Sequence, residues 1–222
     1  MARKTKEQAR ETRQQIIDAA RTVFHQGGVT RSSLDRVAQV ADLTRGAIYW
    51  HFKDKVELFL AVREDVLSPI VEEINSIISS DSYTDPLHGI EASLRRFFQI
   101  LDDCPSARTV LETIVNRCEH VAEFANVQSD LDRLVTEFLS RLEQAYHKAA
   151  ALGTLRVGLD PKLVASDTSA FTCGLAHRVL TGEADCGLRN YVSELISLHM
   201  ALRRPSLTPY EKHSGIHSFD PL

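Results

Sequence analysis

Residues 44–55, TRGAIYWHFKDK, hold the side chains with the clearest chemical potential in this sequence. Folded as a short helix capped by Thr44, they would present small, aromatic and basic residues on one outer side. An arginine can donate two hydrogen bonds to a guanine in the major groove, and tyrosine, histidine and lysine can contact backbone phosphates. The candidate DNA-binding residues are Ser33, Thr44, Arg45, Gly46, Tyr49, Trp50, His51 and Lys55.

Two short helices must position these residues, one over about 33–40 and one over 44–50, joined by a tight turn at 41–43. This is the geometry of a helix-turn-helix unit. Its small core is predicted to consist of Leu34, Val37, Ala38, Ile48 and Phe52, closed by Phe24 and Ile17 of a preceding helix. Trp50 is open to two interpretations, packing at the edge of this unit or reading bases, and packing is favoured. The alternative for the whole segment is a surface helical hairpin with scattered charges.

The distribution of charge supports a polyanion as the partner of this segment. The chain of 222 residues has a net charge of −4. Residues 1–55 carry 11 Lys and Arg against 6 Asp and Glu, whereas residues 56–222 carry 15 against 24. A basic head on an acidic body indicates two separate tasks in one chain. Within the head, Arg3, Lys4 and Lys6 form a basic arm that either reaches a neighbouring phosphate or minor groove or is a solvated tail.

No catalytic, metal or cofactor motif emerges from the sequence. It contains no P-loop, GxGxxG or GxSxG pattern, so we expect no enzyme and no cofactor. The four cysteines form no CxxC pair and are predicted to be reduced thiols. Cys118-Glu119-His120 lacks the second half that a zinc site needs, and no metal is expected. The longest stretch without a charged residue, Thr168–His177, is too short to cross a membrane. We therefore expect a cytoplasmic protein with no membrane contact.

The remaining pattern predicts an all-α fold of about nine helices, because apolar residues recur at three- and four-residue steps and Gly and Pro are scarce. The expected helices span about 10–26, 33–40, 44–50, 54–80, 86–103, 106–117, 121–152, 160–182 and 188–203. Pro69 should kink or break the fourth of these near residues 66–68. The predicted domains are a helix-turn-helix domain at 1–54, a larger helical ligand-binding and dimerisation domain at 55–204, and a flexible tail at 205–222.

The segment TRxQIIxAAxxxF…GG…TxxSLxxVA…A…LTRGAIYWHFKDKxEL resembles the TetR family of bacterial transcriptional repressors. MARKTK at the start and RCEH at 117–120 are similar to the acriflavine-resistance branch, whose members control multidrug efflux pumps. One departure is Asp42 in the turn, where many members have glycine, although aspartate tolerates left-handed backbone geometry. The resemblance implies a homodimer through the last two helices, to which apolar stripes at 164–179 and 191–202 would contribute. It also implies a palindromic double-stranded DNA operator and release by a small-molecule inducer.

The resemblance further implies a ligand pocket in the body. Candidate lining residues follow from i, i+4 spacing and likeness to efflux-regulator pockets: Phe97, Leu111, Val115, Thr172, Cys173 and Ala176. The alternative for each of them is plain core packing. An apolar pocket with few polar groups suits bulky, hydrophobic, drug-like inducers, and Glu64 or Asp65 would be the acid that meets a cationic one. A DNA-binding regulator without an inducer remains the alternative function.

Overall fold

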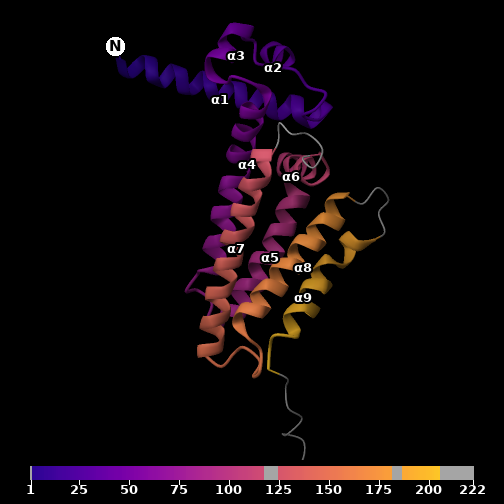
Figure 1. Cartoon of the computed structure of the whole chain (residues 1–222). Coiled ribbons are helices and arrows are strands. Elements are labelled where there is room, and N and C mark those ends of the chain that lie inside the picture. The colour runs from indigo at the N-terminus through magenta and orange to yellow at the C-terminus, as the bar shows by residue number, and fades with distance from the viewer. Residues whose placement is uncertain (1, 118–124, 182–186, 206–222) are drawn as a thin grey trace, which may run out of the picture.

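The computed structural model places almost every described residue of the body and head in helices (Figure 1). It describes residues 2–117, 125–181 and 187–205, and the side chains of 5–114, 134–181 and 187–205. The elements are α1 (Ala2–Gly27), α2 (Leu34–Val40), α3 (Arg45–His51), α4 (Lys55–Ile78), α5 (Pro86–Asp103), α6 (Pro105–Arg117), α7 (Ala125–Ala151), α8 (Pro161–Thr181), the short 3-10 helix η3 (Leu188–Tyr191) and α9 (Val192–Ala201). The predicted all-α class is confirmed, with no strand among these residues. The predicted tail and the cluster at 118–120 lie outside them.

Helix α1 begins at Ala2, eight residues before the predicted start at Arg10. The prediction relied on apolar periodicity, which begins only at Ile16, whereas Lys, Arg, Glu and Gln in the first turns are themselves good helix formers. The basic arm is therefore helical in its backbone. The side chain of Lys6 is exposed, and those of Arg3 and Lys4 lie outside the described residues.

The helix-turn-helix forms as predicted, with a side-chain cap on each of its two helices. Ser33 Oγ accepts a hydrogen bond from the backbone N–H of Arg36 at 3.2 Å, and Thr44 Oγ1 accepts one from Ala47 at 3.2 Å. In the turn, Asp42 has a φ of 53°, the left-handed conformation that aspartate tolerates. The predicted core is confirmed as buried: Ile17, Phe24, Leu34, Val37, Ala38, Ile48 and Phe52.

Helix α4 joins this head to the body and is continuous through Pro69, so of the two predicted outcomes, a kink or a break, the break is excluded. Its start is fixed reciprocally, because Asp54 Oδ1 accepts from the N–H of Glu57 at 2.8 Å and Glu57 Oε2 accepts from the N–H of Lys53 at 2.9 Å. Buried residues on both sides of the proline, among them Leu67 and Ile74, hold the helix in place by tertiary packing. Figure 1 shows α4 running from the head into the bundle of the body.

The body is built by α4–α9, in which α7 packs on α8 and α4 packs on α5. The apolar stripe of α8 at Val164, Thr168, Leu175 and Val179 is buried within this single chain. It was expected to face a second subunit, so that part of the prediction is wrong. The stripe of α9 behaves differently, because Tyr191, Leu198 and Leu202 are each at least 60% exposed. The last helix also begins with the 3-10 turn η3 and is shorter than predicted.

A buried polar cluster ties α7, α8 and α9 together. The hydroxyl groups of Tyr146 and Thr168 lie 2.7 Å apart, and Thr168 Oγ1 is 3.1 Å from Nε2 of His199. The imidazole stacks on Phe171 with ring centroids 3.9 Å apart. Burial, together with the nearby Arg203 guanidinium, lowers the pKa of His199 to about 4. The histidine is therefore neutral in the folded protein at neutral pH.

We predict that acidification weakens the fold through His199. The unfolded chain binds a proton at this residue below about pH 6.5, whereas the folded chain does so only near pH 4, so stability is lost as the pH falls between these values. One pKa unit corresponds to about 1.4 kcal/mol; with partial solvent contact of the ring, the expected loss is about 2 kcal/mol. Urea unfolding at several pH values would measure it. His199→Asn should flatten the slope, and His147→Asn, at an exposed histidine of α7, should not. Equal slopes in both variants would contradict the assignment.

Candidate nucleic-acid interface and ligand cavity

The outer face of α3 presents the predicted side chains to solvent. Thr44, Arg45, Gly46 and Tyr49 are exposed, as is the cap residue Ser33 of α2. Trp50 is 73% exposed, so the favoured interpretation that it packs at the edge of the unit is wrong. Its indole instead meets the His51 ring edge to face, with centroids 4.4 Å apart. Ile48 alone among the central residues of α3 anchors the helix in the core.

Arg45 is held between two neighbours that lie on different helices. Its Nε is 3.2 Å from Oδ1 of Asp35 on α2. Its Nη2 donates to the hydroxyl of Tyr49 at 3.4 Å, and its Cζ lies 5.4 Å from the centre of the tyrosine ring. The hydroxyl of Tyr49 and the carboxylate of Asp35 raise the pKa of Arg45 above its ordinary value. Sequence reasoning missed Asp35 as a functional candidate, because the contact depends on the crossing of α2 and α3.

His51 is half-buried, unlike the exposed members of the predicted set on α3. Burial, and secondarily the positive charge of Arg13 on α1, lower the pKa of its imidazole. Arg13 itself lies over the ring of Phe52, with Cζ 5.0 Å from its centre. A neutral imidazole at this place can accept or donate one hydrogen bond near a phosphate but brings no positive charge.

Lys55 makes contacts within the head. Its Nζ donates to the backbone carbonyls of Thr30 at 2.9 Å and Ser32 at 3.2 Å, in the loop that precedes α2. The predicted phosphate contact would have to share an ammonium group that already bonds to two carbonyls. The same bonds connect the first residue of α4 to the start of the helix-turn-helix.

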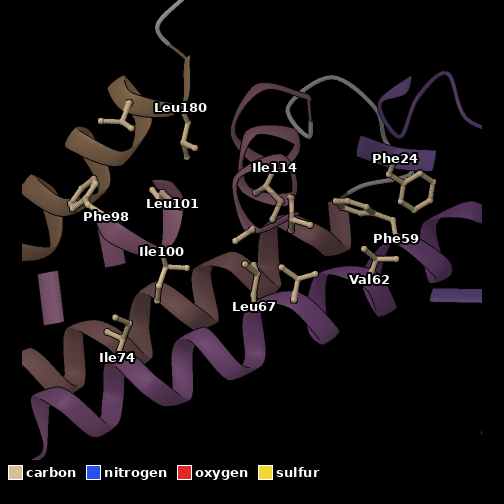
Figure 2. Packing of buried hydrophobic residues seen from close by; sticks show 14 of the residues in the cluster. Phe24, Phe59, Val62, Leu67, Ile74, Phe98, Ile100, Leu101, Ile114 and Leu180 are labelled. Carbon is tan, nitrogen blue, oxygen red and sulfur yellow. The ribbon is translucent and has the colours of Figure 1, made fainter. Parts of the chain in front are cut away.

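The body contains a cavity of about 400 Å³ between α4, α5, α6, α7 and α8. Five of the six predicted ligand residues line it, namely Phe97, Leu111, Thr172, Cys173 and Ala176, and the side chain of Val115 lies outside the described residues. Most of the other lining residues are apolar, and Figure 2 shows several of them: Leu67, Ile74, Ile100, Leu101, Ile114 and Leu180.

The polar groups of this cavity are few, and its described lining contains no Asp, Glu, Lys or Arg. Ser93 Oγ donates to Ile90 O and Thr172 Oγ1 to Thr168 O, both at 2.7 Å, so each hydroxyl hydrogen is bonded within its own helix. Burial raises the pKa of the Cys173 thiol, which keeps it protonated. His177 stands at the exposed side. Among the described residues that line the cavity there is no carboxylate.

The two acids predicted to meet a cationic ligand lie elsewhere. Glu64 is 61% exposed and lies beside Arg63. Asp65 faces the head, where it forms an ion pair with Arg21 and accepts a hydrogen bond from Gln14 at 3.1 Å, both on α1. The helical periodicity of the sequence could not show which way the side chains of Glu64 and Asp65 point. The prediction of a cavity acid at either position is therefore wrong, and Asp65 instead joins the head to the body.

Comparison with known proteins places this geometry in a family. A family model described as "Bacterial regulatory proteins, tetR family" matches residues 16–62. The HTH-type transcriptional regulator AcrR of Shigella flexneri is 33% identical over 93% of this chain and 99% of its own length. The chain belongs to the tetR family. It is therefore a helix-turn-helix DNA-binding transcriptional regulator and not an enzyme.

Solved structures of efflux repressors share the fold of this tetR-family regulator. The SmeT–triclosan complex has a TM-score of 0.73 and 29% identity over 87% of this chain and 92% of that one. NalD, the secondary repressor of the MexAB-OprM multidrug efflux pump in Pseudomonas aeruginosa, has a TM-score of 0.71 and 26% identity over 89% and 98%. In the described part of this regulator, no helix combines the length and hydropathy that a membrane crossing requires. Those same residues contain no group of three or more potential metal ligands.

We predict that Arg45→Ala reduces the discrimination of this regulator between its operator and random duplex by about 1–3 kcal/mol, as expected for loss of a bidentate base contact. Lys53→Ala serves as the matched control, since Lys53 is an exposed cation just after the same helix and its loss should weaken binding to both duplexes by the same factor. Fluorescence anisotropy with the two labelled duplexes measures the ratio. An equal loss on both duplexes for Arg45→Ala would show that this arginine does not read bases.

Proposed function

We propose that this regulator is a ligand-responsive repressor that binds a palindromic operator as a dimer. The operator would overlap the promoter of a multidrug efflux operon or of the regulator's own gene. The observation that carries the proposal is the path of α4. This helix begins at Lys55, after its cap residue Asp54, beside the DNA-binding unit and lines the ligand cavity at Leu67, Ile70, Val71 and Ile74. A compound in the cavity therefore contacts the helix that supports the head.

The proposed switch requires a differential affinity. In the dimer, two α3 helices would enter successive major grooves about 34–36 Å apart. The dimer would have two conformations, one whose α3 helices fit both grooves and one whose α3 helices are spaced wrongly for the operator. A ligand releases the repressor only to the extent that it binds the second conformation more tightly than the first. A tenfold loss of operator affinity requires about 1.4 kcal/mol of coupling. Contacts between α1 and the body, such as Asp65 with Arg21 and Thr109 with His25, would transmit a displacement of α4 and α6.

The lining of the cavity supports a neutral, bulky and largely apolar inducer. Its described walls are aliphatic and aromatic with a few hydroxyl, thiol and imidazole groups, and its volume is that of a drug-sized compound. A cationic ligand would lose its hydration on entering the cavity, and no carboxylate among the described lining residues would compensate for it. The free-energy cost of that desolvation is large. The related SmeT is seen in a complex with triclosan, which makes that compound a reasonable first probe here.

The dimer would use the exposed apolar side chains of α8 and α9. Leu163 is 70% exposed at the start of α8, and Leu198 and Leu202 are 66% and 60% exposed on α9. Large apolar side chains that cluster on an exposed helix face are typical of an interface. Burying them against a second copy would set a fixed distance between the two heads.

The first experiment is an anisotropy titration of the full chain against duplex DNA from upstream of its own gene. Random duplex is the control, two salt concentrations separate electrostatic from specific binding, and triclosan and other neutral efflux substrates are added afterwards. Selective binding that one of these compounds reverses supports the proposal. Selective binding that no compound reverses supports a regulator without such an inducer. Absence of selectivity would contradict an operator at this place.

We predict that filling the cavity uncouples ligand from DNA. Ala176→Trp should place an indole in the space bounded by α5 and α8. Operator binding should persist, while the inducer concentration needed for release rises at least tenfold. Gln99→Trp, at an exposed position of α5 outside the cavity, is the matched control and should leave release unchanged. Normal release from Ala176→Trp would remove this cavity as the inducer site.

We predict that a charge on the exposed face of α9 separates the subunits. Leu198→Arg should convert the dimer to a monomer in size-exclusion chromatography with light scattering, because a guanidinium would be desolvated in the interface. Operator affinity should fall with it, since both half-sites must be bound together. Val157→Arg, at a 96% exposed position in the α7–α8 connection, should remain dimeric. A dimeric Leu198→Arg would place the interface elsewhere.

A further inference from the structure

The guanidinium of Arg45 is oriented before any DNA is present. Asp35 approaches it on the Nε side at 3.2 Å, and the Tyr49 hydroxyl approaches Nη2 at 3.4 Å with the tyrosine ring alongside. Both side chains of the Arg45–Asp35 pair remain exposed, 65% and 54% respectively. The arrangement therefore fixes the direction of the arginine without burying it.

Orientation matters for this side chain because a free arginine samples many rotamers and can pair with any nearby phosphate. A planar guanidinium reads guanine by two parallel hydrogen bonds, which require one edge of the plane to point into the groove. With the carboxylate at Nε and the Tyr49 hydroxyl at Nη2, the hydrogens of Nη1 and the second hydrogen of Nη2 are left for such a contact. The same carboxylate repels phosphate oxygens, which disfavours contacts made without regard to sequence.

We propose that Asp35 is a positioning residue that increases the sequence specificity of Arg45 at the expense of overall DNA affinity. This inference rests on the proposed base-reading role of Arg45. Asp35 is itself on α2 and need not touch a base. Its effect passes through the direction and availability of the guanidinium.

A purely structural role for Asp35 makes different predictions. The residue lies in the first turn of α2, where an acid interacts favourably with the helix dipole. Loss of that interaction would lower the melting temperature and weaken binding to every duplex alike. A role as a bulk negative charge would instead strengthen binding to every duplex alike. Only a positioning role changes the ratio between operator and random DNA.

The test is Asp35→Asn in the full chain, titrated against the selectively bound upstream duplex and against random duplex over a range of salt. We expect random-duplex affinity to rise two- to threefold and its salt slope to steepen by about one ion, because Arg45 becomes free to pair with phosphate. The operator-to-random ratio should fall about fivefold, the upper range for an exposed ion pair. Glu11→Gln, at an exposed acid of α1, is the charge-matched control and should leave the ratio unchanged.

A double-mutant cycle with Arg45→Ala completes the experiment. In the Arg45→Ala background, Asp35→Asn should no longer change the ratio, because its effect requires the arginine. An unchanged ratio for Asp35→Asn in the parent chain, or an equal change in both backgrounds, would overturn the positioning role. If Arg45→Ala itself left the ratio unchanged, the base-reading role of Arg45 would be wrong as well. The Arg45→Ala result therefore distinguishes a failure of the base-reading role from a failure of the positioning role of Asp35 alone. Should the asparagine variant fold poorly, Asp35→Ser gives the same comparison.

Discussion

Helix α4 must supply buried side chains to two different cores, and the rest of the molecule is arranged around that constraint. Its first turns place Leu58, Phe59 and Val62 against the head, where Phe59 meets Phe24 edge to face with ring centroids 6.1 Å apart. Its later turns place Leu67 and Ile74 in the body (Figure 2). Because a helix is stiff along its axis, a change in packing around the later residues necessarily bears on the first ones. Capping by Asp54 and the bonds from Lys55 to the loop before α2 extend this connection to the helix-turn-helix.

Local signals were sufficient for the head and for most helix boundaries. Caps and tight apolar spacing specify α2, α3 and the start of α4 without reference to distant residues. The cavity candidates were found partly by resemblance, and five of the six line the cavity. On α8, the i, i+4 spacing of Thr172 and Ala176 selects one helix face. The start of α1 was misjudged because a polar helix has no apolar period to detect.

The wrong predictions share one physical cause, because a local sequence pattern does not show which neighbour a helix face packs against. The stripe of α8 is apolar for the same reason whether it faces its own chain or a partner, and only the packing of α6 and α7 against α8 shows that it is internal. Asp65 and Glu64 are adjacent in sequence, so their different surroundings follow from the rotation of α4 about its axis. The contact between Asp35 and Arg45 depends on how two short helices cross, which no spacing rule encodes.

The cavity, whose described lining has no Asp, Glu, Lys or Arg, bears on how much of a ligand the proposed switch would need. Burial of apolar surface contributes about 25 cal/mol per Å², so a tenfold change in operator affinity, about 1.4 kcal/mol, corresponds to roughly 55 Å² more ligand surface buried in one conformation than in the other. That is a small part of a drug-sized compound. If the proposed function holds, a cavity whose described walls are mostly apolar, on the helix that supports the head, would respond to many unrelated compounds without a specific polar contact to any of them. In the proposed switch, DNA selectivity would reside in Arg45 and its neighbours, and the breadth of ligand response would reside in α4, α5 and α8.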